Sequence, residues 1–239
     1  MATSVRYADM RPQKFRERIE QCPVAYLPLG TLEWHGEQLP LGSDAIISEG
    51  LMCACASRFG GVVMPPIHVG PDRATRQEDG SLQQGMDMAD VTVPKKQLDG
   101  SCYWISEGMF NTLIDAILEQ LKRAGFVSVF ADGHGPSRRA WVSRLSERKD
   151  RFGLDLFGVT EEIVGEWKSQ IDHAAKNETS MVMALRPELV DLDCLDSDRG
   201  IWPQGVAGED PRDSTVDYGR DCINASVEVV GRLIFGEGL

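Results

Sequence analysis

The chain has 239 residues, of which 42% are hydrophobic and 26% are charged, and its formal net charge is −12. These values predict one globular domain, spanning residues 1–239, that buries a sizeable core without needing disulfides. The acidic balance argues against nucleic-acid binding, and the lack of an apolar run of about 18 residues argues against a membrane span, so we expect a protein that acts on a small molecule.

Short apolar runs alternate with longer stretches of helical periodicity along the chain. The clearest helix is predicted at 107–124, where Phe110, Ile114 and Leu118 recur on one face and Gly125 ends the pattern. The alternation predicts an α/β protein whose mostly parallel sheet is covered on both faces. In chain order, the predicted elements are strand 24–29, helix 45–58, strand 61–67, helix 107–124, strand 126–131, helix 138–148, strand 154–159 and helix 214–235.

Residues 71–100 are rich in Gly, Asp and Gln and show weak periodicity. We predict a long loop or lid there, because loops of this length inside a domain are usually functional. In parallel α/β folds, ligands bind beyond the carboxyl ends of the strands. We therefore expect the site on the segments that follow the strands predicted at 24–29 and 126–131.

A first polar cluster follows the strand predicted at 24–29. Glu33 and His35 are two residues apart, so in an extended segment their side chains point to the same side. Asp44 begins the next predicted helix, where free backbone N–H groups favour the ionised carboxylate that a metal ion needs. Taken singly, the three residues also fit an N-cap, a surface charge and a half-buried histidine. Their combination directly after a strand favours a metal site.

Two further clusters contain histidine. His134 lies between two glycines, which permit a sharp turn, although a lone Gly-His-Gly is also typical of a tight turn without function. Asp132 either supports His134 or only shapes that turn. The third cluster contains Asp172, His173 and Glu178, which would supply a further ligand and a proton carrier, and which alone is equally typical of a solvated helix start.

The pooled donors are imidazoles and carboxylates without a thiolate, and this mixture suits Zn²⁺, Mn²⁺ or Fe²⁺. Asp44 is the candidate bridge, because two-metal sites are usually built around a shared carboxylate. Such a site ionises water near neutral pH and polarises a carbonyl group, which fits hydrolysis of an amide. The six cysteines show no Cys-x-x-Cys spacing, which argues against a cysteine zinc site. Residues 1–6 lack the pattern of a signal peptide, so we expect a cytoplasmic protein.

Three motifs resemble those of the creatininase family, in the same order and spacing and over nearly the whole chain. The resemblance implies a three-layer α/β/α sandwich, a homohexamer and two divalent metal ions per subunit, with zinc the expected ion and manganese or iron as alternatives. The motifs are Gly30-Thr31-Leu32-Glu33-Trp34-His35-Gly36 with Leu39-Pro40 and Asp44, then Gly133-His134-Gly135, then His173-Ala174 with Glu178-Thr179-Ser180.

The resemblance also implies roles for individual residues. Glu33, Asp44 and His134 would hold one ion, His35 and Asp44 would hold the other, and His173 would give a proton to the leaving group.

This chain departs from creatininase itself at the second motif. Creatininase carries a glutamate ligand two residues after the motif histidine, where this chain has Pro136, and Gln38 stands where histidine is usual. These differences argue against creatinine as the substrate. We expect Glu178 to complete the ligands of the second ion instead.

The motifs together predict a metal-dependent hydrolase in which metal-activated water attacks a carbonyl group of a small polar, cyclic substrate. The expected bond is the C–N bond of a cyclic amide or formamide, with His173 as proton donor and Asp172 orienting it. Hydrolysis of a ring C–C bond in a keto-inositol is one alternative. A non-catalytic binding or assembly member of the family is another.

Three residues are weaker candidates for contact with the substrate. Trp34 lies between two expected ligands, and a packing role is equally open for it. His68 follows the strand predicted at 61–67 and is also compatible with a structural role. Arg73, in the predicted lid, would bind an anionic group of the substrate or would only be solvated.

Overall fold

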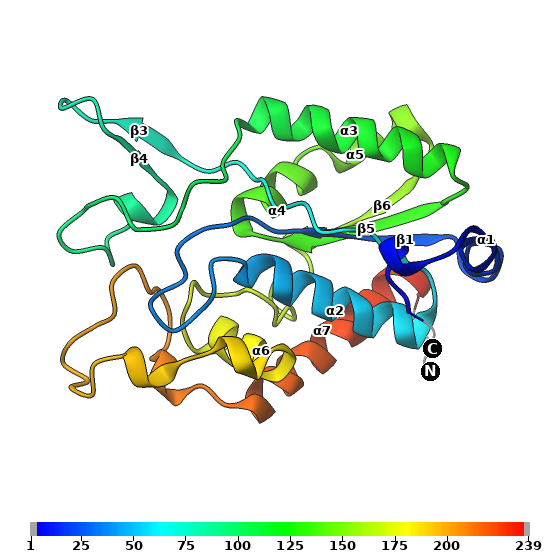
Figure 1. The fold of residues 1–239 in the computed structure, drawn as a ribbon. Coiled ribbons are helices and arrows are strands. Elements are labelled where there is room, and N and C mark those ends of the chain that lie inside the picture. The colour runs from blue at the N-terminus through cyan, green and yellow to red at the C-terminus, as the bar shows by residue number, and fades with distance from the viewer. Residues whose placement is uncertain (1–3, 237–239) are drawn as a thin grey trace.

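The computed structural model describes residues 4–236, so residues 1–3 and 237–239 of the predicted domain, including the first residues inspected for a signal peptide, lie outside the described part. A parallel sheet of four strands, in the order β2-β1-β5-β6, forms the middle layer (Figure 1). Its strands are β1 (Val24–Leu29), β2 (Val62–Val63), β5 (Ser128–Gly133) and β6 (Asp155–Phe157).

Helices cover both faces of this sheet, as the alternation of strand and helix patterns predicted (Figure 1). The layer on one face consists of α2 (Ser43–Phe59), α6 (Lys176–Leu185) and α7 (Val216–Phe235), and the layer on the other consists of α3 (Glu107–Arg123), α4 (Gly135–Val142) and α5 (Leu145–Phe152).

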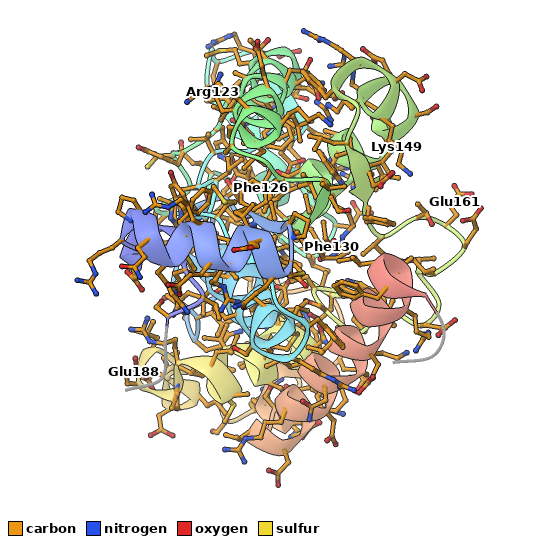
Figure 2. All side chains as sticks on the ribbon, turned by 90° about the vertical axis from the view of Figure 1, so that its right-hand side faces the viewer. Arg123, Phe126, Phe130, Lys149, Glu161 and Glu188 are labelled. Carbon is orange, nitrogen blue, oxygen red and sulfur yellow. The ribbon has the colours of Figure 1, made fainter. Side chains whose placement is uncertain are left out.

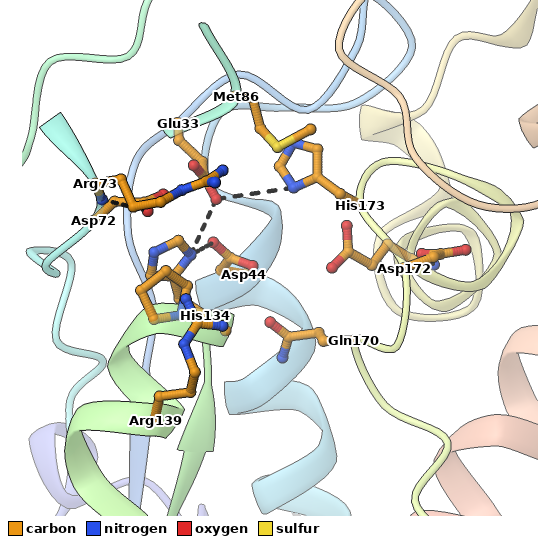
Figure 3. Close-up of a pocket in the computed structure, with 13 residues that line it drawn as sticks. Glu33, Asp44, Asp72, Arg73, Met86, His134, Arg139, Gln170, Asp172 and His173 are labelled. Atoms are coloured by element: carbon orange, nitrogen blue, oxygen red, sulfur yellow. Dashed lines mark hydrogen bonds and ion pairs between the residues drawn. The ribbon is translucent and has the colours of Figure 1, made fainter. Parts of the chain in front are cut away.

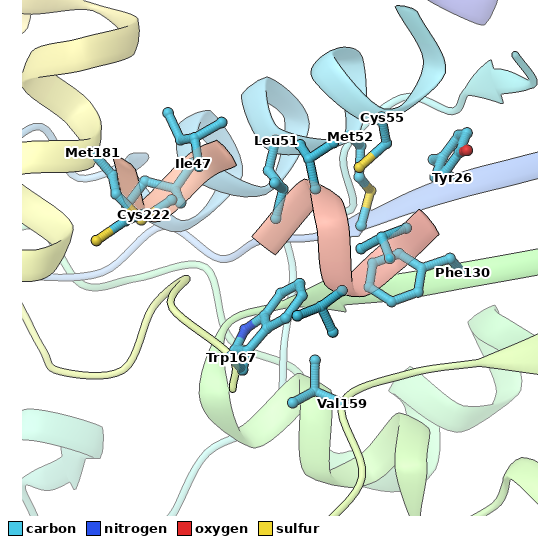
Figure 4. Packing of buried hydrophobic residues seen from close by; sticks show 14 of the residues in the cluster. Tyr26, Ile47, Leu51, Met52, Cys55, Phe130, Val159, Trp167, Met181 and Cys222 are labelled. Carbon is cyan, nitrogen blue, oxygen red and sulfur yellow. The ribbon is translucent and has the colours of Figure 1, made fainter. Parts of the chain in front are cut away.

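Strand β1 is buried along its whole length because its side chains alternate between two apolar clusters. Tyr26 points into the cluster beneath α2, together with Phe130 and residues of α2 such as Leu51 (Figure 4). Leu27 points into the other cluster, which contains Ile114 of α3. In Figure 2 this interior, with Phe126 and Phe130, lies beneath charged side chains such as Lys149 that project outward.

The remaining elements lie at the ends of the sheet. The predicted lid at residues 71–100 contains an antiparallel hairpin that projects from the layers in Figure 1. Helix α1, which the sequence pattern did not reveal, has no buried residue. These elements are α1 (Pro12–Gln21), the hairpin strands β3 (Ala74–Arg76) and β4 (Leu82–Gln84), and the short 3-10 turns η1 (Tyr7–Asp9), η2 (Gly85–Met88), η3 (Pro187–Leu189), η4 (Leu192–Cys194) and η5 (Pro211–Asp213).

The single helix predicted at 138–148 is wrong, because the segment forms α4 and α5 with a break between them. Arg144 leaves helical geometry at the break, with φ −119° and ψ 15°. The break turns Arg148 inward, where its guanidinium donates to Asp115 and Asn111 at 2.8 Å each. A buried arginine with carboxylate and amide partners therefore sets the chain direction here.

The predicted strands differ from the observed ones at their ends. Of residues 61–67 only β2 is a strand, because Pro65 and Pro66 have no N–H to donate to a ladder. Ile67 then rejoins the sheet through a single bridge to Leu29. Strand β5 runs two residues past the predicted end at 131, so His134 follows it directly. Over residues 4–236, we find no helix with both the length and the apolar character needed to cross a membrane.

Candidate metal centre

The polar clusters converge at the carboxyl ends of β1 and β5, where ligands bind in parallel α/β folds. Two glycines make the convergence possible. A Cβ atom on Gly30 would lie 2.7 Å from the Cβ of Ala45, so only glycine lets the segment after β1 pass the start of α2. A Cβ on Gly133, at φ +153°, would lie 1.8 Å from the carbonyl oxygen of Leu29. The adjacent His134 N–H donates to that same oxygen at 2.7 Å.

One group of donor atoms comes from Glu33, Asp44 and His134, which are all buried. The Nδ1 atom of His134 lies 3.0 Å from Oε1 of Glu33 and 3.2 Å from Oδ2 of Asp44. The three residues come from the loop after β1, the start of α2 and the end of β5. They can therefore share one ion only because the fold places these three elements together (Figure 3).

A second buried group comes from His35, Asp44 and Glu178. The Nε2 atom of His35 lies 3.5 Å from Oδ1 of Asp44 and 3.6 Å from Oε2 of Glu178. Its Nδ1 lies 3.1 Å from the carbonyl oxygen of Glu33, so Nδ1 carries a hydrogen and Nε2 is the nitrogen that faces the group. Asp44 thus presents one oxygen to each group.

The spacing of these atoms fits metal coordination. Ligand atoms bound to one tetrahedral zinc ion, each about 2.0–2.2 Å from it, lie about 3.3–3.6 Å from one another. The separations around the two histidines run from 3.0 to 3.6 Å. The donor set also fits, since buried carboxylates in such number need a compensating cation.

The charges of the cluster are strongly perturbed. Burial raises the pKa of Glu33 and, well above its usual range, that of Glu178. Burial opposes the charged form of His35, but Asp44 and the other carboxylates outweigh it and raise the pKa of His35 to about 10. His134 has a raised pKa for the same reason, with Glu33 as the main partner. A cation bound to this cluster would therefore replace protons on the same atoms.

His173 stands beside this cluster, with its ring centroid 4.5 Å from that of His35. Its Nε2 atom lies 2.9 Å from the carbonyl oxygen of Trp34, so Nε2 carries the hydrogen. The other nitrogen, Nδ1, lies 4.0 Å from Oε1 of Glu33 and is the face turned toward the cluster. Burial, followed by the charge on His35, lowers the pKa of His173 to about 3, so the ring is neutral at pH 7.

Asp172 does not orient His173 as the sequence suggested. Its carboxylate accepts the N–H groups of Asn177 at 2.7 Å and of Glu178 at 3.2 Å, and so caps the start of α6. Burial raises the pKa of Asp172 to about 6. The alternative interpretation of this segment as a solvated helix start is also wrong, because Asn177 and Glu178 are buried. Helix α6 instead delivers Glu178 to the cluster.

A cavity of about 410 Å³ opens onto the two groups, and Figure 3 shows the side chains around it. Arg73 lines the cavity, whereas His68 is exposed and lines neither this cavity nor the adjoining one. The indole of Trp34 is tied to the carbonyl oxygen of Gln204 at 3.0 Å, and its side chain is not part of the lining. Of the three weaker candidates, only Arg73 therefore faces the space where a substrate would lie.

Arg139 and Gln170 are among the cavity-wall residues that sequence reasoning missed. Arg139 lies on α4 and also lines an adjoining cavity of about 390 Å³ with Arg73. Neither residue belongs to a motif. The nearest signal was the position of Arg139 five residues after His134, and its use would have required knowing that α4 starts at the cavity.

Comparison with known proteins gives the family context of these residues. A family model described as "Creatininase: Creatinine amidohydrolase" matches residues 8–234. The creatinine amidohydrolase of Pseudomonas putida is 25% identical over 216 residues, which cover 81% of this chain and 76% of that protein. A shorter match, 32% identical over 68 residues, is to the 3-dehydro-scyllo-inosose hydrolase of Thermotoga maritima and covers 28% of this chain and 22% of that protein.

Solved structures share the fold along almost the whole chain. A mutant creatininase described as the Zn-Zn type aligns with a TM-score of 0.68 at 17% identity, covering 97% of this chain and 98% of that one. A structure described as "Creatininase Mn" aligns with a TM-score of 0.69 at 18% identity, covering 96% and 98%. At sequence identities of 17% and 18%, the similarity of these structures to this chain shows a shared fold alone.

Proposed function

The chain belongs to the creatininase family of metal-dependent hydrolases, and from this premise we propose that it cleaves the C–N bond of a small cyclic amide or formamide at a centre of two divalent ions. The observation that carries the proposal is the position of Asp44, whose two oxygens face His134 and His35 respectively. A carboxylate held between two histidines in this way is suited to bridge two ions.

We assign Glu33, Asp44 and His134 to one ion and His35, Asp44 and Glu178 to the other. Bound there, two divalent ions would polarise the substrate carbonyl and make water ionise near neutral pH. Zinc is the ion we expect, with manganese or iron as alternatives, because the donors are imidazole and carboxylate. The structures of relatives described as Zn-Zn and Mn types support this choice.

His173 is the residue we assign to proton transfer. Because its Nε2–H is engaged by the Trp34 carbonyl, only Nδ1 is free to act. In this proposal Nδ1 takes a proton as water adds to the carbonyl carbon, and returns it to the departing nitrogen as the C–N bond breaks. The ring is expected to be neutral at pH 7, and a neutral ring is the form that can take the proton in the first of these two steps.

The wall of the cavity supports a substrate other than creatinine. Pro136 lies on this wall at the position where creatininase has a glutamate ligand, and Glu178 approaches from α6 instead. We propose that Arg73 and Arg139 contact the outer part of the substrate, since both line the two adjoining cavities. No salt bridge engages either guanidinium within residues 4–236.

Cleavage of a ring C–C bond is the second candidate reaction. The partial likeness to an inosose hydrolase favours it. Such a cleavage would also begin with attack of water on a ring carbonyl. A non-catalytic role is a third candidate, motivated by Pro136 at a ligand position.

The resemblance further supports a homohexamer, which light scattering after gel filtration would test. A cytoplasmic setting is part of the proposal, because all six cysteines are free thiols.

The deciding experiment is metal content per subunit, measured by elemental analysis of protein purified without chelator. About two equivalents of zinc, manganese or iron are expected, and a screen of cyclic amides, formamides and cyclic ketones then separates C–N from C–C cleavage. Protein that neither contains metal nor takes it up on titration would overturn the two-metal centre. Metal without turnover of any candidate would favour the non-catalytic role.

A further inference from the structure

Gln170 is buried in the wall of the metal-centre cavity without a protein partner. Its side chain is 7% exposed, and neither its Oε1 nor its Nε2 makes a hydrogen bond within residues 4–236. Figure 3 shows the carboxamide pointing into the cavity on the side of Asp44 and His134. A carboxamide in a cavity wall that makes no hydrogen bond to the protein leaves both its donor and its acceptor available to a ligand in that cavity.

The backbone of Gln170 is held in a conformation that non-glycine residues rarely adopt, with φ at +52°. Arg138 maintains it by donating to the carbonyl oxygens of Ser169 at 3.1 Å and Gln170 at 3.3 Å. The same guanidinium is fixed by two contacts with the buried carboxylate of Asp132, at 2.5 and 3.1 Å. The carboxamide is therefore aimed by a partly buried ion pair anchored on β5, and not by contacts of its own.

The chemistry of a carboxamide limits what it can recognise. It offers an acceptor and a donor side by side, so its complement is a group with an N–H beside a C=O. An open-chain secondary amide is trans and places those atoms on opposite sides. A ring forces them onto the same side, so a cyclic amide can meet both atoms of Gln170 at once.

We propose that Gln170 determines specificity by binding the non-reacting N–H/C=O edge of a cyclic ureide while another carbonyl of the ring faces the metal centre. This inference rests on the proposed function and names its substrate class. It selects cyclic ureides over formamides and keto-polyols, which lack that edge. His173, three residues further along the same segment, lines the same cavity.

The test compares hydantoin with 1-methylhydantoin, which lacks the N1–H of the N1–H/C2=O edge. This is the edge that does not react when C4=O faces the metal centre and N3 is the departing nitrogen. Affinities for the metal-loaded protein are measured by calorimetry, or as kcat/KM where a probe is turned over. The wild type should prefer hydantoin roughly tenfold. This is the usual effect of losing one hydrogen bond when its partner stays buried and unpaired. In Gln170→Met, which keeps the length but not the polar atoms, the preference should fall to within about twofold. Gln120→Met, on the exposed face of α3, is the matched control and should retain it.

Equal affinity of the two probes for the wild type would overturn the proposal, as would a preference that survives in Gln170→Met. Failure of both probes to bind a protein that carries its metal would also overturn it while leaving the metal centre standing. Absence of metal would instead overturn the proposed function, and elemental analysis of the same sample separates the two failures.

A packing role for Gln170 makes a different prediction, which needs no ligand. If the side chain serves recognition, Gln170→Met should unfold at the same temperature as the wild type or a higher one, because it removes unpartnered polar atoms. If the side chain serves packing, the variant should unfold several degrees lower, and the proposal would be wrong.

Discussion

The Nε2 atom of His173 lies 2.9 Å from the carbonyl oxygen of Trp34, a residue of the same loop that carries Glu33 and His35. A carbonyl oxygen only accepts, so this contact fixes the tautomer and turns the lone pair of Nδ1 toward the cluster. The loop that supplies two metal-ligand candidates therefore also sets the tautomer of the proposed proton carrier. Their geometry is coupled through one backbone segment.

Replacing His173 should affect turnover without affecting metal binding. In His173→Ala we expect kcat to fall about 10²- to 10⁴-fold, the usual contribution of a positioned proton carrier. Metal content should stay at the wild-type value, because Asp44 and its partners are untouched. The matched control is His68→Ala, since His68 is exposed and outside the cavity. Loss of metal in His173→Ala would show that Nδ1 is a ligand and would contradict the assigned role.

Asp44 and Glu178 should differ in how much metal they control. Asp44 belongs to both of the fully buried donor groups and Glu178 only to the second of them. We therefore expect Asp44→Asn to lose both ions and Glu178→Gln to lose about one per subunit, by elemental analysis after gel filtration. Asp217→Asn, whose side chain is 92% exposed on α7, should keep two and serves as the control. Two ions retained in Asp44→Asn would refute the bridge.

The metal-free protein should lose stability as the pH rises, and the metal-loaded protein should not. The pKa of His35 is about 10 in the fold against an ordinary 6.5, so its stabilising charge is fully present below about pH 6.5 and is lost as the pH rises through 10. The raised pKa values of Glu33 and Glu178 act in the same direction. A bound cation would replace these protons.

Calorimetric melting between pH 6.5 and 10, with and without chelator, measures this difference. The melting temperature of chelator-treated protein should fall across the range, and the fall should be smaller in His35→Gln. Zinc-loaded protein should show little change until other groups titrate. Parallel curves with and without metal would mean that protons and cations do not share these atoms.

The parts of the site that sequence could predict are those governed by neighbours along the chain. Glu33, His35 and Asp44 follow one strand and begin one helix, so their spacing alone places them at one edge of a parallel sheet. His134 follows the next central strand, and the structure brings it to the same place. Their binding of metal stays a prediction.

The parts that sequence could not predict depend on contacts between distant segments. The direction of Gln170 is set by Arg138, 32 residues earlier, whose guanidinium joins it to Asp132. The break between α4 and α5 accompanies the contact of Arg148 with Asp115, 33 residues away. Asp172 looked like a partner for the histidine beside it, but the unpaired N–H groups of α6 compete for its carboxylate. No local pattern records such competitions.

A substitution at Gly133 should disable the site through the backbone alone. In Gly133→Ala the new Cβ would lie 1.8 Å from the Leu29 carbonyl oxygen, so β1 and β5 must separate where His134 is positioned. We expect at least about 2 kcal/mol lower stability in urea, from the strained φ and the overlap together. Metal content should fall as well, because His134 moves away from Glu33 and Asp44. The matched control is Gly108→Ala in α3, where a Cβ meets no atom within 4 Å and should add up to about 1 kcal/mol of helix stability. Equal stability of the two variants, or full metal content in Gly133→Ala, would mean that this close approach of the strands does not position the histidine.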